Sequence, residues 1–207
     1  MKFSTLRASA ALALILALAG CGGKASFDVS GTVIGLSNPG LVLTMGGNDD
    51  VNVAPAAGTV NFTFGRRLSY GDAYEIRVKQ DPVHMTCSAY RGTSGTAGQT
   101  TNIAAIFNCT KNAYMVTGWV TGLTAQVATT DPQLVLINGS TGGQVTIAAA
   151  TNGSTNPTFG FGPVEQGVAY GITVQTQPKG QFCSVVNGSG LMGDAIVSNV
   201  QVSCKAQ

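Results

Sequence analysis

The stretch Gly31-Thr-Val-Ile-Gly-Leu36 returns later in the chain as Gly118-Trp-Val-Thr-Gly-Leu123. Three further features follow each copy in the same order: a Leu-Val-Leu triplet, a Phe-x-Phe triplet and a pair of cysteines. An ordered internal repeat indicates two copies of one structural unit. We therefore predict a first repeat over residues 26–110 and a second over residues 113–205, with Lys111-Asn112 between them.

Apolar and polar side chains alternate with a period of two inside both repeats. Phe27, Val29 and Val33 alternate with Asp28 and Thr32, and the segments that start at Tyr114, Leu41, Phe62 and Ile103 behave in the same way. Alternation in short segments between Gly, Asn and Pro turns is typical of strands that are buried on one face. The expected fold is all-β, with two tandem Ig-like or prealbumin-like antiparallel β-sandwiches of about seven strands each.

The N-terminus has the composition of a secretion signal. Lys2 and Arg7 precede an uncharged apolar run over residues 10–20, which is too short to cross a bilayer because spanning needs about 20 apolar residues. We predict a signal helix over residues 1–20 that is removed from the mature protein. Leu18-Ala-Gly-Cys21 resembles the lipobox of bacterial lipoproteins, which implies cleavage before Cys21, fatty acylation of Cys21 and a lipidated tether over residues 21–25. The alternative is an ordinary signal peptide followed by a chance cysteine.

The cysteine count fits this interpretation. The chain has 5 cysteines, an odd number for a secreted protein. If Cys21 carries lipid, four remain to pair in an oxidising compartment. Of the three possible pairings, the repeat favours Cys87–Cys109 and Cys183–Cys204, because each repeat then holds the same bond. A four-thiolate zinc site is the alternative, although the close spacing typical of such sites is missing.

A second resemblance concerns the repeats themselves. Leu68-x-x-Gly71-x-x-Tyr74-x-Ile76-x-Val78 and its counterpart from Val164 to Val174 resemble prealbumin-like sandwiches, which include the carboxypeptidase regulatory-like and collagen-adhesin B-type repeats. The mature chain also resembles repeat-bearing proteobacterial lipoproteins of unassigned function. Adhesin repeats often hold a Lys–Asn or Lys–Asp isopeptide bond. We expect none here, because residues 27–33 and 114–120 contain no lysine.

Charge argues against nucleic acid as a partner. The chain has 11 Lys and Arg against 9 Asp and Glu, and its bases are not clustered into the stripe that nucleic-acid binding needs. No cofactor is expected. Gly46-Gly-Asn-Asp-Asp50 could hold calcium, but the spacing of its acids favours a hairpin turn, and we predict no metal site. The adjacent pair Arg66-Arg67 is interpreted as a solvated turn.

Few residues suggest catalysis. His84 is the only histidine, and the second repeat has Gly180 in its place, so a loop histidine is the simpler interpretation. Trp119 and Tyr90 could contact a glycan or a partner protein. Trp119 could equally pack between the repeats. A hydrolase acting on envelope polymers is the alternative function, and its candidate residues all fall in the first repeat: Asp49, Asp50, Asp72, Glu75, Asp81 and His84.

The sequence thus predicts a non-catalytic envelope lipoprotein rather than an enzyme. It would be held to the membrane through lipid on Cys21 and would serve as a binding, adhesion or spacer module, with an envelope protein or a glycan as possible partner. Gly22 is not the aspartate that retains lipoproteins at the inner membrane, so the resemblance implies the outer membrane.

Overall fold

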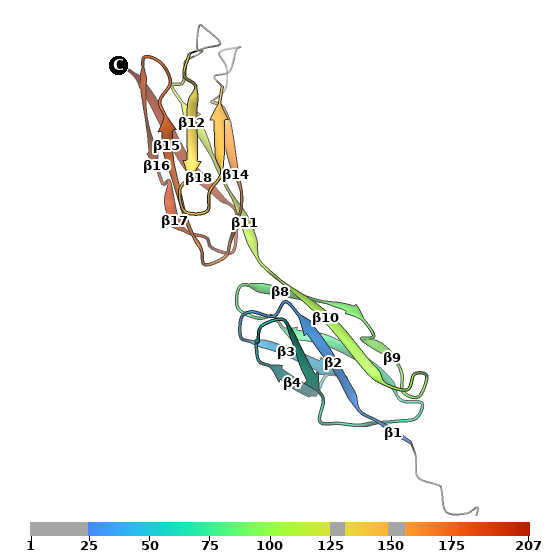
Figure 1. The fold of residues 1–207 in the computed structure, drawn as a ribbon. Coiled ribbons are helices and arrows are strands. Elements are labelled where there is room, and N and C mark those ends of the chain that lie inside the picture. Colours follow the sequence, from blue (N-terminus) through green and yellow to red (C-terminus); the bar gives the residue numbers. More distant parts are fainter. Residues whose placement is uncertain (1–24, 125–130, 149–155) are drawn as a thin grey trace, which may run out of the picture. The chain divides into compact units, whose positions relative to one another are not determined.

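The computed structural model describes residues 25–124, 131–148 and 156–207, and these residues form strands and turns without any helix (Figure 1). The predicted signal peptide, Cys21 and residues 22–24 of the predicted tether lie outside the described residues. The chain divides into two compact units. The first holds the chain up to Asp81 together with Cys87–Asn108, and the second holds Pro82–Thr86 together with Cys109–Gln207.

Two four-stranded sheets form the first sandwich, in the orders β5-β2-β10-β8 and β4-β3-β7-β9, while β1 pairs with β6. The strands are β1 (Ser26–Phe27), β2 (Val29–Ile34), β3 (Leu41–Met45), β4 (Asp49–Val53), β5 (Thr59–Thr63), β6 (Leu68–Ser69), β7 (Ala73–Gln80), β8 (Met85–Arg91), β9 (Ser94–Thr96) and β10 (Ile103–Lys111).

The second sandwich repeats this plan, with sheets β14-β11-β18-β16 and β13-β12-β15-β17. Its strands are β11 (Ala113–Thr121), β12 (Leu134–Asn138), β13 (Gln144–Ile147), β14 (Thr158–Glu165), β15 (Ala169–Thr176), β16 (Gln181–Val186), β17 (Ser189–Leu191) and β18 (Val197–Ala206). The all-β sandwich prediction is confirmed.

Strand direction differs from the expectation in one respect. The first and last long strands of each sandwich run parallel: β2 beside β10, and β11 beside β18. The pairings of β2 with β5, of β3 with β4 and β7, and of β7 with β9 are antiparallel, as predicted, and so are those of β11 with β14, of β12 with β13 and β15, of β15 with β17 and of β16 with β18. Alternation in the sequence indicates which face a side chain occupies, but it carries no information about which strands become neighbours or in which direction they run.

The two four-stranded sheets of each sandwich include a strand that alternation missed, β9 in the first sandwich and β17 in the second. Both are three residues long and centred on a glycine. Tyr74 pairs with Gly95 and Tyr170 pairs with Gly190, and the tyrosine ring lies so close that a Cβ on either glycine would meet the tyrosine oxygen at 3.0 or 2.7 Å. The tyrosine of the Gly-x-x-Tyr motif therefore covers the bare backbone of its neighbouring strand.

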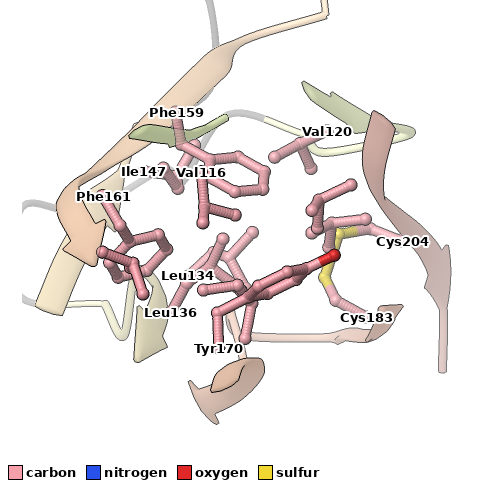
Figure 2. Close-up of a cluster of buried hydrophobic side chains, with 14 of the residues drawn as sticks. Val116, Val120, Leu134, Leu136, Ile147, Phe159, Phe161, Tyr170, Cys183 and Cys204 are labelled. Atoms are coloured by element: carbon pink, nitrogen blue, oxygen red, sulfur yellow. A yellow bond between two sulfur atoms is a disulfide. The ribbon is translucent and has the colours of Figure 1, made fainter. Parts of the chain in front are cut away.

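The inner faces of both sheets supply the core of each sandwich. Figure 2 shows the second core, in which β11 and β12 place Val116, Val120, Leu134 and Leu136 out of contact with solvent. The rings of Phe159 and Phe161 meet edge to face at 6.1 Å, as Phe62 and Phe64 do at 5.9 Å in the first sandwich. The buried bond Cys183–Cys204 lies at the other side of this cluster and joins β16 to β18 (Figure 2). Cys87 and Cys109 are also disulfide-bonded, so the structure forms both predicted pairs.

The disulfide of the second sandwich sits at the edge of a sheet, and a side chain covers that edge. Cys183 and Cys204 are direct neighbours on β16 and β18 with Cα atoms 4.0 Å apart, a separation typical of pairs that do not hydrogen-bond to each other. The N–H and C=O of Cys183 therefore turn outward. The Gln177 carboxamide meets both: its oxygen accepts from the Cys183 N–H at 2.7 Å, and its nitrogen donates to the Cys183 C=O at 3.0 Å.

We expect Gln177→Ala to lower the free energy of unfolding of the second sandwich by about 1–2 kcal/mol, because two backbone groups lose their partner. Urea unfolding followed by the emission of Trp119, the only tryptophan in the chain, measures this loss. Gln175→Ala is the matched control, since Gln175 is exposed on the neighbouring strand β15. Equal midpoints for the two variants would refute a role for Gln177 in covering the edge.

Candidate functional site

Three of the five carboxylates proposed for a hydrolase form ion pairs on the surface of the first sandwich. Lys79 binds Asp50, and this hydrogen bond holds the pKa of the Asp50 carboxyl below its ordinary value. Arg77 binds Glu75 at 2.7 Å, and Arg66 lies 3.8 Å from Asp49. Each of these three acids therefore lies in an ion pair with a neighbouring base. A general acid at neutral pH needs a raised pKa, and that of Asp50 is lowered.

The other two acids of that set hydrogen-bond to backbone groups near opposite ends of strand β7. Asp72 accepts the N–H of Ser69 at 2.8 Å in the turn before β7, and Asp81 accepts the N–H of Cys87 at 2.8 Å after it. Because β7 has 8 residues and strands rise about 3.3 Å per residue, the two carboxylates are separated by roughly 25 Å. They cannot act on one bond.

His84 occupies a turn position rather than a pocket. It is exposed, and its φ of 59° is left-handed, as is the φ of 70° at Gly180. A left-handed backbone is ordinary for glycine and uncommon for other residues, which explains why the second repeat has glycine at this place. The loop interpretation of His84 agrees with this geometry.

The suspected calcium loop is the turn between β3 and β4. Met45 pairs with Asp49 across this hairpin, and Gly46 and Gly47 supply the positive φ angles of the turn. Within residues 25–124, 131–148 and 156–207, no group of three or more His, Cys, Asp or Glu side chains could hold a metal ion. The same residues include no helix with the length and apolar character needed to cross a bilayer.

The outer face of the sheet β14-β11-β18-β16 brings Trp119 together with residues from distant parts of the sequence. Side chains that pair across neighbouring strands point to the same side of a sheet. Trp119 on β11 pairs with Thr158 on β14 and with Gln201 on β18, and Gln201 pairs with Val186 on β16. These four residues form a transverse row, here called the Trp119 row.

The next row on the same face is polar and uncharged. Thr121 pairs with Ser203, and Ser203 pairs with Ser184. Thr117 and Thr121, which flank Trp119 along its own strand, are tied to the sheet: their hydroxyls donate to the carbonyls of Val197 and Val202 at 3.1 and 3.3 Å. Trp119 itself is half-buried, so part of its indole faces solvent.

On the corresponding face of the first sandwich, the aromatic residue lies on a different strand. Thr32 stands at the position of Trp119 and pairs with Asn61 on β5 and Ile106 on β10. Tyr90, 66% exposed, lies on the edge strand β8. The two predicted aromatic candidates therefore lie on the same kind of outer face, in different sandwiches.

Sequence analysis identified Trp119 and Tyr90 but missed Thr158, Gln201 and Ser203. Alternation along residues 117–121 places Thr117, Trp119 and Thr121 on one face. The missed residues come from strands that follow much later in the chain, and their register is set by sheet pairing rather than by any local pattern. The first repeat has Asn61 and Ile106 at the positions of Thr158 and Gln201, so a comparison of the two repeats did not single out these residues either.

Neither a protein-family model nor a curated protein sequence matches the chain. Among solved structures, the Bacillus anthracis TIE protein is similar with 13% sequence identity and a TM-score of 0.47 over 86% of this chain and 34% of that one. The chain thus spans about a third of that protein's length. A shaft pilin, SpaA from Lactobacillus rhamnosus GG, is similar with 10% identity and a TM-score of 0.28 over 88% of this chain and 100% of the pilin. The major pilin protein of a Streptococcus pyogenes serotype gives 11% identity and a TM-score of 0.31, covering 89% and 98%.

Proposed function

We propose that the protein is a non-catalytic binding module of the bacterial cell envelope, anchored through lipid on Cys21. The observation that supports this proposal best is that the candidate catalytic acids are engaged in ion pairs and in hydrogen bonds to the backbone. Asp49, Asp50 and Glu75 are ion-paired, and Asp72 and Asp81 hold turns. These five acids therefore have structural partners already, which argues against a hydrolytic site built from them.

The finer parts of the proposal rest on the sequence. Each repeat, over residues 26–110 and 113–205, is a prealbumin-like sandwich of the kind found in carboxypeptidase regulatory-like and adhesin repeats. Residues 1–20 are a cleaved signal and residues 21–25 a tether. Three acyl chains on the new N-terminus would make attachment stable, because each buried CH₂ contributes about 0.8 kcal/mol and one chain alone holds a protein only marginally. Gly22 favours the outer membrane.

Membrane fractionation tests the anchor. The wild-type protein, expressed with its own N-terminus in a bacterium with lipoprotein processing, should stay in the membrane pellet through an alkaline wash and enter solution only with detergent. Cys21→Ala, expressed with an ordinary cleavable secretion signal in place of residues 1–20, should leave the pellet, because the acyl acceptor is lost while residues 25–207 are unchanged. An identical distribution of the two proteins would refute the lipid anchor.

Binding requires a separate test. Purified Cys21→Ala protein should sediment with isolated cell envelopes in a saturable manner, and the same protein unfolded in urea and diluted under reducing conditions should not. If the folded protein stays in the supernatant at every envelope concentration, the binding function is wrong even where the anchor is correct.

A further inference from the structure

The outer face of the sheet β14-β11-β18-β16 includes two adjacent uncharged rows and a half-buried tryptophan. The Trp119 row, Thr158–Trp119–Gln201–Val186, and the adjacent row, Thr121–Ser203–Ser184, contain no charged side chain. Charge first appears one step further on, where Lys205 pairs with Phe182. Among the seven residues of these two rows, an anionic ligand would find no base and a cationic ligand no acid.

Several polar groups on this face have no partner within the described structure. The indole N–H of Trp119, the carboxamide of Gln201 and the hydroxyl of Ser203 make no hydrogen bond to any residue among 25–124, 131–148 and 156–207. The hydroxyls of Thr117 and Thr121, by contrast, already donate to backbone carbonyls, which fixes them in place and leaves their lone pairs as acceptors. The face therefore offers a donor, an amide and a hydroxyl around one aromatic ring.

We propose that this face binds a neutral polysaccharide, with one sugar ring stacked on the indole of Trp119; this assignment rests on the proposed binding function and names its ligand class. A pyranose presents a face of C–H groups to an aromatic ring and a rim of hydroxyls that both donate and accept. Rows on one face of a strand are two residues, about 7 Å, apart and strands are about 4.8 Å apart. A ring centred on Trp119 therefore places its rim over Gln201 and Ser203.

The chemistry favours a glycan over a peptide as the occupant. A peptide that adds to a sheet uses the backbone of an edge strand, whereas Trp119 lies on β11, which is flanked by β14 and β18. A protein partner is expected to seek larger apolar anchors or charge complementarity. The side chains next to Trp119, on Thr117, Thr121, Thr158 and Gln201, are hydroxyls and an amide, which match the hydroxyl rim of a sugar. The exposed apolar side chains Val186 and Phe182 lie further away, on the edge strand β16.

The first repeat supplies the substitutions that test the proposal. Thr32 and Ile106 stand where the second sandwich has Trp119 and Gln201, in the same parallel pairing, so Trp119→Thr and Gln201→Ile introduce residues that this fold already accommodates. Tyr70→Thr is the matched control, because it removes an aromatic side chain, 70% exposed, in the other sandwich. Circular dichroism melts of all variants establish that each is folded.

The experiment uses Cys21→Ala protein with dextran, laminarin and galactomannan as neutral probes and alginate as an anionic one. At least one neutral glycan should shift the emission of the only tryptophan to shorter wavelength and shield it from acrylamide. In affinity electrophoresis, Trp119→Thr should weaken binding at least about tenfold, Gln201→Ile should weaken it severalfold, and Tyr70→Thr should leave it unchanged. Alginate should have no effect.

Three results would overturn the assignment: no neutral glycan changes the tryptophan emission, alginate binds as well as the neutral probes, or Trp119→Thr binds like wild type. Sedimentation with isolated envelopes separates this failure from failure of the proposed function. If wild type and Trp119→Thr sediment equally, the binding function stands and the ligand is a protein or another surface. If neither sediments, both proposals fall.

Discussion

Gly118→Ala should lower the free energy of unfolding of the second sandwich by about 3 kcal/mol, at the upper end of what overpacking costs. A Cβ at Gly118 would lie 2.1 Å from the backbone oxygen of Val200 and 2.6 Å from Cζ of Phe159. The first contact is with the parallel neighbour β18 and the second with a core ring, so neither can move without opening the sheet or the core. Urea unfolding followed by circular dichroism and by Trp119 emission measures the loss.

Gly162→Ala is the control for this prediction. Gly162 lies on β14 of the same sandwich, and a Cβ there would meet nothing within 4 Å. Its substitution should change stability by no more than about 0.5 kcal/mol, and in the stabilising direction if the loss of unfolded-state entropy dominates. Comparable destabilisation by both variants would show that glycine at 118 is not required by close packing. Gly31, which meets Ala105 and Phe62 in the same way, extends the test to the first sandwich.

Removing the disulfide Cys183–Cys204 should have a similar effect. The bond closes a loop with a sequence separation of 21 residues. Closing a loop of that length contributes about 3 kcal/mol in the chain-entropy model. For a domain of this size the double variant Cys183→Ala/Cys204→Ala should melt more than about 10 °C below wild type. The transition is followed by Trp119 emission.

Reductant provides the matched comparison. Wild-type protein in excess thiol should approach the melting temperature of the double variant. Thiol should not change the Trp119 transition of the double variant, because its second sandwich has no disulfide left to reduce. If reduction leaves the wild-type Trp119 transition in place, the bond either does not form or does not stabilise this sandwich, and the account of its stability is wrong.

Local patterns in the sequence predicted most strands of this fold, and their failures have a common cause. Alternation located β2, β3, β7 and β10 because each buries one face. It could not locate β9 and β17, since these short strands pack a glycine under a tyrosine ring and bury no apolar side chain of their own. The parallel pairing of β2 with β10 was missed for a different reason: neighbour order depends on where the chain crosses between sheets.

The repeat contributed information that single residues could not. It indicated the cysteine pairing, because a bond that recurs in both copies must join equivalent positions. It could not identify the candidate binding face, because the repeats differ there: Trp119 and Gln201 in one sandwich, Thr32 and Ile106 in the other. A face assembled from β11, β14 and β18 depends on long-range register, which only the folded chain provides.

Intact-mass and peptide analysis of protein extracted from membranes without reductant tests the central claim. The claim is that Cys21 is acylated and that the other four cysteines form one disulfide within each β-sandwich. The account predicts an N-terminus at Cys21 bearing fatty acyl mass, with Cys87 joined to Cys109, Cys183 joined to Cys204 and no free thiol. A protein that still begins at Met1, an N-terminal Cys21 without added lipid mass, or a bond between cysteines of different repeats would contradict it.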